Sequence, residues 1–296
     1  ILQAVFAALT VGSIYALVAV GVTLVYSATG IINFAQGEFV MLGGMIMVTL
    51  YGARHWPLVL AVPVTIGITA AVAAALMKVS YRPERNVSLI TVLIITIGAS
   101  LLVSGSALKV WDGDVHRFPP FSGDAPVRLA GATVAPQALW VMATTAVVGV
   151  ALALFLRFTI YGKAMRACAI DRGAAAIVGI RVKGMVLLSF VMSGALGCVA
   201  GIMITPLTMV DYSSGMLLAI KGFAAAMLGG MGNVAGAVLG ALVFSFLEAF
   251  SVTFVSSSLK ELATFVVIIL ILLFMPRGLM GPRRVEGLDE EDVLGH

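Results

Sequence analysis

Three polar residues stand close together in one of the most apolar parts of the sequence. Asn33, Gln36 and Glu38 belong to the stretch NFAQGEF, and long apolar runs precede and follow it. A polar side chain at membrane depth is costly unless it faces the interior of a helix bundle or a water-filled cavity. The stretch therefore predicts a broken helix that lines a solute path or forms a hinge beside it, with Gly37 allowing the backbone to bend.

Two other arrangements fit the same residues: a polar clamp between helices, and a hydrated loop at the cytoplasmic surface. We favour a hinge at the cytoplasmic end of the first span, next to the translocation path. There Asn33 and Gln36 would cap and brace the turn, and Glu38 would lie at the positive end of a short second helix. Direct contact with a solute is the second interpretation.

A glycine series near the other end of the chain has a spacing that suits helix packing. Gly232, Gly236 and Gly240 recur every four residues, which lets two membrane helices approach backbone to backbone. A ligand-binding role for these glycines is the alternative. Glu248 continues the series, and an acid late in a span needs a partner. We interpret it as a structural hydrogen-bond acceptor, with proton transfer as the alternative.

The segment 157–184 is too long for a plain connection, and its alanine-rich pattern predicts short amphipathic helices. Such a helical segment on the cytoplasmic side would dock a soluble partner; an interfacial helix on anionic lipid is the alternative. We expect glycines to bound the element, and a bulky charge at Ala164 or Ala167 to disrupt docking while leaving the chain folded. The residues singled out are Gly162, Ala164, Arg166, Ala167, Asp171 and Gly179.

The sequence lacks the usual motifs for nucleotide binding, for metal binding and for hydrolytic catalysis. The GxxxxGK[ST] phosphate loop, HExxH and GxSxG are all missing, and the histidines are scattered. Cys168 and Cys198 lie in different contexts, a loop and a span, without a CxxC spacing. We expect no enzymatic activity, no metal site and no cofactor in this chain.

The composition decides which elements must position these residues. The chain of 296 residues is 61% hydrophobic and only 11% charged, and its mean hydropathy is +1.11. A soluble domain carries about 25% charged residues, so lipid must be the solvent here. We predict an all-α, polytopic membrane bundle of about eight to ten segments, some of them short or broken. The spans are expected near 3–26, 38–51, 57–78, 88–109, 137–156, 185–206, 216–231, 234–255 and 261–275.

Basic residues predict which side of the membrane each connection faces. Most of the 18 Lys and Arg lie in the segments 78–86, 157–184 and 276–284, which places these segments in the cytoplasm. The connection 111–131 and the amino terminus then lie outside. We expect one transmembrane permease domain over 1–281 and a disordered, acidic cytoplasmic tail over 282–296.

One pentamer occurs twice. MLGGM stands at Met41–Met45 and again at Met227–Met231, and the expected topology runs the two copies in opposite directions. Two copies in opposite directions are what an inverted repeat gives. Chance is the alternative in a chain this rich in Gly, Leu and Met.

Three stretches together resemble the signature regions of a known family. They are VYSATGIINFAQGEFVMLGG, GKAMRACAIDRGAAAIVGI and LGGMGNVAGAVLGALVFSFLE. On these residues the chain resembles the branched-chain amino-acid ABC transporter permeases, and within them the LivH type. The resemblance extends from residue 4 to residue 281.

The resemblance implies a permease subunit of an importer in the bacterial inner membrane. Its partners would be a homologous second permease, two cytoplasmic ATPases that hydrolyse ATP, and a periplasmic substrate-binding protein. The segment 162–180 would dock into the ATPase, although family members often have Asn in place of Asp171. The solute would be a branched-chain amino acid; urea, short amides and other small solutes use similar permeases. An ion-driven secondary transporter remains the alternative mechanism.

Overall fold

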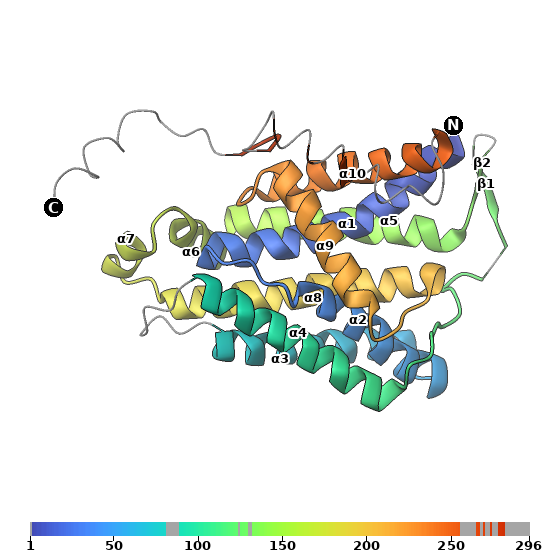
Figure 1. Cartoon of the computed structure of the whole chain (residues 1–296), viewed down its shortest axis with the longest axis horizontal. Coiled ribbons are helices and arrows are strands. Elements are labelled where there is room, and N and C mark those ends of the chain that lie inside the picture. Colours follow the sequence, from blue (N-terminus) through green and yellow to red (C-terminus); the bar gives the residue numbers. More distant parts are fainter. Residues whose placement is uncertain are drawn as a thin grey trace.

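The protein is a bundle of long helices in this computed structural model, which describes residues 2–80, 89–123, 125–129, 132–254, 265–266, 269, 273 and 278–281 (Figure 1). Its long helices are α1 (Leu2–Thr29), α2 (Gln36–Met47), α3 (Leu58–Ser80), α4 (Leu89–Trp111), α5 (Pro136–Phe158), α8 (Val182–Thr208), α9 (Ser214–Gly229) and α10 (Val234–Phe254). Six of the described helices are long and apolar enough to cross a membrane. The predicted all-α membrane bundle is confirmed.

Shorter elements complete the described part of the chain. A π-helical turn, η1 (Val48–Ala53), continues α2, and the helices α6 (Ile160–Ile170) and α7 (Arg172–Ile177) lie between α5 and α8. A small antiparallel hairpin joins β1 (Val127–Leu129) to β2 (Ala132–Val134). Each predicted span before residue 255 coincides with a helix, whereas the ninth, 261–275, falls almost wholly outside the described residues, as does the tail 282–296.

Helices α1, α5, α8 and α10 run roughly along the long axis of the molecule, whereas α9 crosses them obliquely (Figure 1). Helices α6 and α7 lie at one end; the β-hairpin and the amino terminus lie at the other. The basic segment 157–184 and the segment 111–131 are thus at opposite ends, as the charge pattern requires. We therefore refer to the α6–α7 end as the cytoplasmic end.

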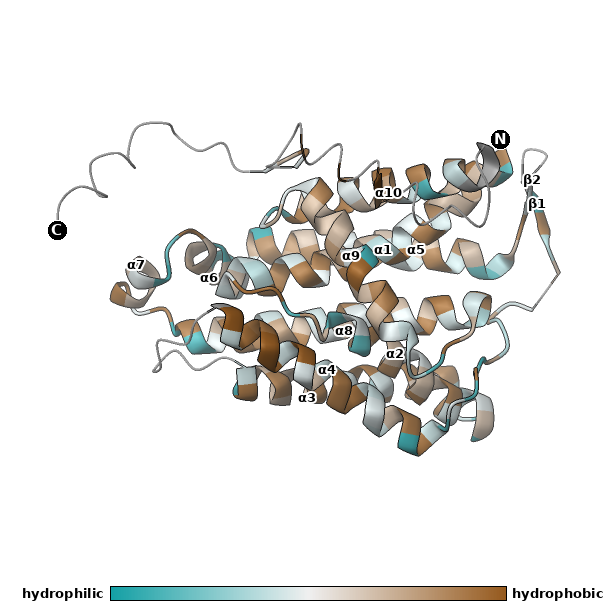
Figure 2. Ribbon diagram, viewed as in Figure 1, coloured by the Kyte–Doolittle hydropathy of each residue, from teal (hydrophilic) through white to brown (hydrophobic). Residues whose placement is uncertain are grey.

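Apolar residues are frequent along the outer helices as well as in the core (Figure 2). On α4, Leu101 is 68% and Leu102 is 74% exposed, and α5 is buried over only 11% of its apolar window. A soluble protein would hide such faces in its core. Lipid or a second membrane subunit must cover them.

The centre of the bundle is filled by α2, whose twelve residues are all buried. Helix α8 approaches it so closely that a Cβ at Gly201 would overlap the carbonyl oxygen of Val40. A Cβ at Gly43 would likewise collide with the backbone of Cys198 in α8. Backbone-to-backbone packing between small residues is how membrane helices gain van der Waals contact where lipid removes the hydrophobic driving force.

The two MLGGM copies lie in different settings. The chain that enters α2 runs antiparallel to α9: Phe34, just before α2, lies 6.0 Å from Phe223 between ring centroids, while Glu38 in the first turn of α2 lies against Gly215. The opposite directions agree with an inverted repeat. The first copy, however, lies wholly within α2, whereas the second runs from the end of α9 into the following turn.

Candidate functional site

Gln36 joins three helices in the middle of the bundle. Its amide Nε2 donates to the carbonyl oxygen of Ser193 in α8 at 3.2 Å. The Ser193 hydroxyl contacts Oε1 of Gln36 and the carbonyl oxygen of Gly21 in α1. Gln36 is fully buried, so these bonds replace the water that its amide would otherwise need.

Glu38 extends the polar cluster to α4 and α9. Its Oε1 accepts a hydrogen bond of 2.7 Å from Ser100, the middle residue of α4. The other oxygen, Oε2, has no hydrogen-bond partner among the described residues. A Cβ at Gly215 would lie 2.8 Å from this oxygen, so the carboxyl group packs against the first turn of α9. The positive end of a helix favours a carboxyl group at this place.

Asn33 shapes the chain just before α2. Its Oδ1 accepts from the backbone N–H of Ala35 at 3.1 Å, and its buried Nδ2 has no partner in the described part of the chain. The N-cap of α2 is Ala35, and it forms no side-chain cap. The expected capping of this helix by Asn33 and Gln36 is therefore not found, because Asn33 bonds the cap residue itself and Gln36 reaches to α8.

The depth of the cluster also differs from the expectation. Helix α1 ends at Thr29, Gly30 turns the chain with φ +67°, and the segment then runs back into the bundle before α2 begins. Gln36 and Glu38 reach Ser193 and Ser100, which lie near the middles of α8 and α4. The stretch NFAQGEF thus starts near the helix ends, where Asn33 lies beside Thr29 and Ser80, and reaches the middle of the bundle with Gln36 and Glu38.

Burial limits what this cluster can do. Asn33 and Glu38 are each 2% exposed and Gln36 is 0% exposed. A Cβ at Gly37 would overlap the carbonyl oxygen of Gly215, so α2 and α9 touch through their backbones here. This geometry suits a polar clamp that fixes where the chain re-enters the bundle, more than a surface that lines a solute path.

A second buried polar cluster links α1, α9 and α10. Glu248 accepts a hydrogen bond from the Tyr15 hydroxyl at 2.8 Å, and its other oxygen lies 2.8 Å from the ammonium nitrogen of Lys221. That nitrogen also lies 5.8 Å from the centre of the Tyr15 ring. The cation and the carboxylate therefore compensate each other inside the bundle.

The glycine series divides between a helix and a turn. A Cβ at Gly236 would overlap the carbonyl oxygen of Gly229, and one at Gly240 would overlap that of Ala225, so both glycines lie against α9. Gly232 lies outside the helix, in the turn before α10, with φ +91°. There it supplies a backbone conformation that other residues adopt at a cost.

Helices α6 and α7 form a compact unit at the cytoplasmic end. Thr159 caps α6 by accepting from the N–H of Gly162 at 2.9 Å, and Asp171 caps α7 by accepting from the N–H of Ala174 at 3.0 Å. Gly162 lies within the first turn of α6, where a Cβ would strike the backbone of α5. Gly179 follows α7 with φ +87° and ends the unit.

The alanines singled out from the sequence face inward. Ala164 and Ala167 are half-buried against the core, on the same side of α6 as the buried Met165 and Cys168. Burial raises the pKa of the Cys168 thiol, and the charge of Arg172 opposes that shift. The thiol therefore stays protonated at neutral pH and contributes to packing. A bulky charge on either alanine would disturb packing within the chain.

The outward surface of the unit consists of residues that the sequence reasoning did not select. Ile170 is 89%, Ile177 88% and Val178 75% exposed. Arg166 and Arg172 are exposed beside them. The signal available in the sequence was that Ile170 and Ile177 flank the stretch DRGAAA, and in the structure they are the last residues of α6 and α7.

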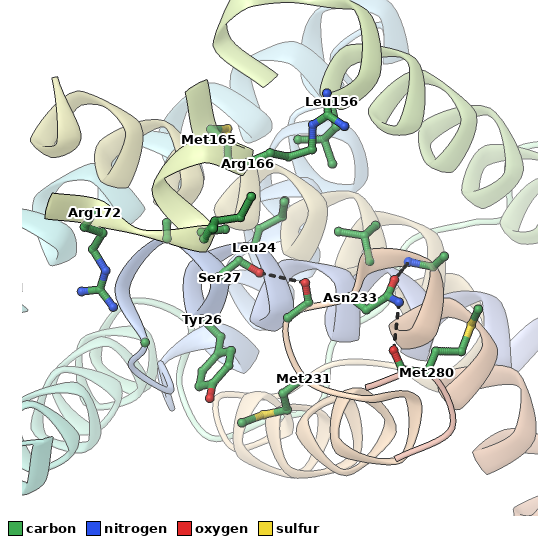
Figure 3. Close-up of a pocket in the computed structure, with 17 residues that line it drawn as sticks. Leu24, Tyr26, Ser27, Leu156, Met165, Arg166, Arg172, Met231, Asn233 and Met280 are labelled. Carbon is green, nitrogen blue, oxygen red and sulfur yellow. Dashed lines mark hydrogen bonds between the residues drawn. The ribbon is translucent and has the colours of Figure 1, made fainter. Parts of the chain in front are cut away.

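A cleft of about 780 Å³ opens between this unit and the turn that joins α9 to α10 (Figure 3). Arg166 of α6 and Arg172 of α7 line one side, and Asn233 and Met280 line the other. The walls otherwise carry mainly apolar side chains. Among the described residues no group of three or more His, Cys, Asp or Glu is arranged to hold a metal ion.

Comparison with known proteins identifies relatives among transport permeases. Residues 4–275 match the family described as "Branched-chain amino acid transport system / permease component". The chain is 34% identical to the high-affinity branched-chain amino acid transport system permease protein LivH of Escherichia coli K12, over 96% of this chain and 97% of that protein. It is 33% identical to BraD of Pseudomonas aeruginosa over the same shares, and 25% identical to a probable LivH of Methanocaldococcus jannaschii over 93% and 90%.

Proposed function

The chain belongs to the permease family of branched-chain amino acid transport systems, and we propose that it moves branched-chain amino acids through the membrane as one subunit of an ABC importer. It is a multi-pass protein of the bacterial inner membrane. Members of this family are permease components and not enzymes. In the proposal, ATP is bound and hydrolysed on separate subunits.

The outward surface of α6 and α7 is the observation that carries the proposal. It presents exposed aliphatic side chains, Ile170, Ile177 and Val178, beside the cations Arg166 and Arg172. Aliphatic residues at the tip of a capped, glycine-bounded unit suit insertion into a groove of a soluble protein. We assign this surface as the docking site of the cytoplasmic ATPase. When the ATPase closes, α6 would transmit that movement to the bundle.

The filled centre of the bundle supports a second permease subunit. Helix α2 occupies the middle with every residue buried, and α8 and α9 pack most closely against it. A solute path through this centre would have to displace backbone contacts such as that between Gly37 and Gly215. A path between two permease chains, along an outer apolar face, requires no such displacement. A homologous chain would supply the opposite wall, and a periplasmic binding protein would deliver the solute.

The chemistry of the outer faces fits an aliphatic solute. A path lined by side chains such as those exposed on α4 and α5 offers apolar contact with few charges. Affinity for one particular solute would then reside mainly in the binding protein. For the ion-driven alternative, Glu248 gives little support because it is paired with Lys221. Glu38 is the buried acid that keeps an oxygen without a partner among the described residues.

Reconstitution tests the proposal. We expect liposomes that contain this chain, the homologous permease and the ATPases to accumulate labelled leucine only with ATP and the binding protein. Ile177→Val serves as a matched control for Ile177→Glu, which should abolish uptake at equal protein levels. Accumulation by this chain alone under an ion gradient would refute the ABC mechanism, and transport of urea without leucine would refute the solute class.

A further inference from the structure

A segment near the end of the described chain, residues 279–281, lies at the cytoplasmic cleft. Residues after Gly278 return to the turn between α9 and α10, where the N–H of Leu279 donates to the carbonyl oxygen of Leu228 at 2.8 Å. The N–H of Met280 donates to Gly229 at 2.9 Å, and Asn233 donates to the carbonyl oxygen of Met280 at 3.0 Å. These bonds fix the polypeptide at the wall of the cleft (Figure 3).

The opposite side of the cleft carries cations. Arg166 extends from α6 and Arg172 from α7; in Figure 3, Arg172 lies at the left and Arg166 at the top, with Asn233 and Met280 at the right. Arg172 reaches the end of α1, where a Cβ at Gly30 would lie 2.7 Å from its Nη2. Neither guanidinium group forms a salt bridge within the described part of the chain. The cleft therefore offers two anion-binding groups among apolar walls.

The sequence that follows Gly281 is rich in acids. Glu286, Asp289, Glu290, Glu291 and Asp292 make up five of the 14 acidic residues of the chain. An extended chain spans up to about 3.3–3.6 Å per residue, so Glu286 can lie about 17 Å from Gly281 and Asp292 much farther. Over the eleven residues to Asp292 the reach is about 36–40 Å, so the chain is long enough for its later acids to cross the cleft from the wall where Met280 is bonded.

We propose that the acidic segment 286–292 binds in the cytoplasmic cleft and pairs with Arg166 and Arg172. Each exposed ion pair contributes at most about 1 kcal/mol, but the segment is tethered at the rim. A short tether raises its effective concentration to about the millimolar range, so several weak pairs suffice. The bound segment would reduce the positive charge that α6 and α7 present to a soluble partner.

Cross-linking in native membranes tests this with the full chain. In a background of Cys168→Ala and Cys198→Ala, Asp289→Cys is combined with Ala169→Cys, because Ala169 lines the cleft. Ala176→Cys is the matched control, since Ala176 is exposed on α7 and does not line the cleft. We expect disulfide formation from position 289 to be several-fold faster with position 169 than with position 176.

If the proposal is correct, the difference in cross-linking rate between positions 169 and 176 depends on the charges of the arginines and the acids. Arg166→Gln with Arg172→Gln, neutralisation of the remaining acids, or about 1 M salt, where the screening length is about 3 Å, should each lower the rate at 169 to that at 176. Equal rates at the two positions, or rates that ignore charge, would overturn the proposal. So would an anionic lipid that co-purifies with the chain and is lost in the double arginine variant, because the cleft would then hold a headgroup.

Discussion

The ammonium nitrogen of Lys221 in α9 lies 2.8 Å from the Glu248 carboxylate in α10, and both side chains are buried. Removing one partner of a buried pair costs about 3–5 kcal/mol, because the other charge is left uncompensated. We therefore expect Lys221→Met to lower the thermal midpoint of the detergent-solubilised protein sharply. The double variant Lys221→Met with Glu248→Gln should recover most of the loss, since Gln still accepts from Tyr15. Equal destabilisation of both variants would contradict this account.

Gly37 provides a test of the contact between α2 and α9. Gly37→Ala should reduce the amount of folded protein in the membrane, because the new Cβ would overlap the carbonyl oxygen of Gly215 and overpacking costs about 1–3 kcal/mol or more. Gly67→Ala in α3 is the control, since nothing lies within 4 Å of its Cβ position. Fluorescence-detected size exclusion measures both variants, and the two should differ clearly.

The bond between Gln36 and Ser193 can be measured as a coupling energy. Gln36→Met keeps the size of the side chain but leaves the Ser193 hydroxyl and carbonyl without this partner. We expect the free energy of unfolding to fall by about 1–3 kcal/mol, the cost of an unsatisfied buried polar group. Ser193→Ala in the Gln36→Met background should cost less than Ser193→Ala alone. Purely additive losses would mean that the two residues do not act together.

Asp171 should act through its cap on α7. Asp171→Asn keeps an oxygen for the N–H of Ala174 and should leave uptake nearly unchanged. Asp171→Ala should destabilise the α6–α7 unit by about 1 kcal/mol, the usual cost of losing an N-cap, and lower uptake in proportion. If the Asn variant were as impaired as the Ala variant, the charge itself would be needed.

Substitutions at inward-facing and outward-facing residues of the α6–α7 unit should have different effects. Ala164→Glu forces a charge into a half-buried position, so we expect less folded protein in the membrane. Ile177→Glu changes a side chain that is 88% exposed, so the protein level should stay normal while transport is lost. Immunoblots of membranes together with uptake separate the two outcomes; a normal level for Ala164→Glu would contradict the packing assignment.

Hydropathy and charge in the sequence determined the membrane class, the positions of the spans before residue 255 and the ends at which the loops lie. Those properties depend on short windows of residues, since lipid contact and positive charge act locally. The capped helices around Asp171 were also predictable, because capping joins residues only three apart. The depth at which Gln36 and Glu38 lie could not be predicted from the sequence. It depends on Gln36 meeting Ser193, 157 positions away in the chain.

Only the tertiary structure decided which residues meet and which face solvent. The sequence could mark Glu248 as an acid in need of a partner, but the 27 positions that separate it from Lys221 carry no local signal of the pair. The same holds for α6: its alanines and isoleucines are all apolar, and packing against the bundle chose which of them are buried. Close backbone contact, as between Gly37 and Gly215, is fixed by how helices cross, a property that no window of sequence contains.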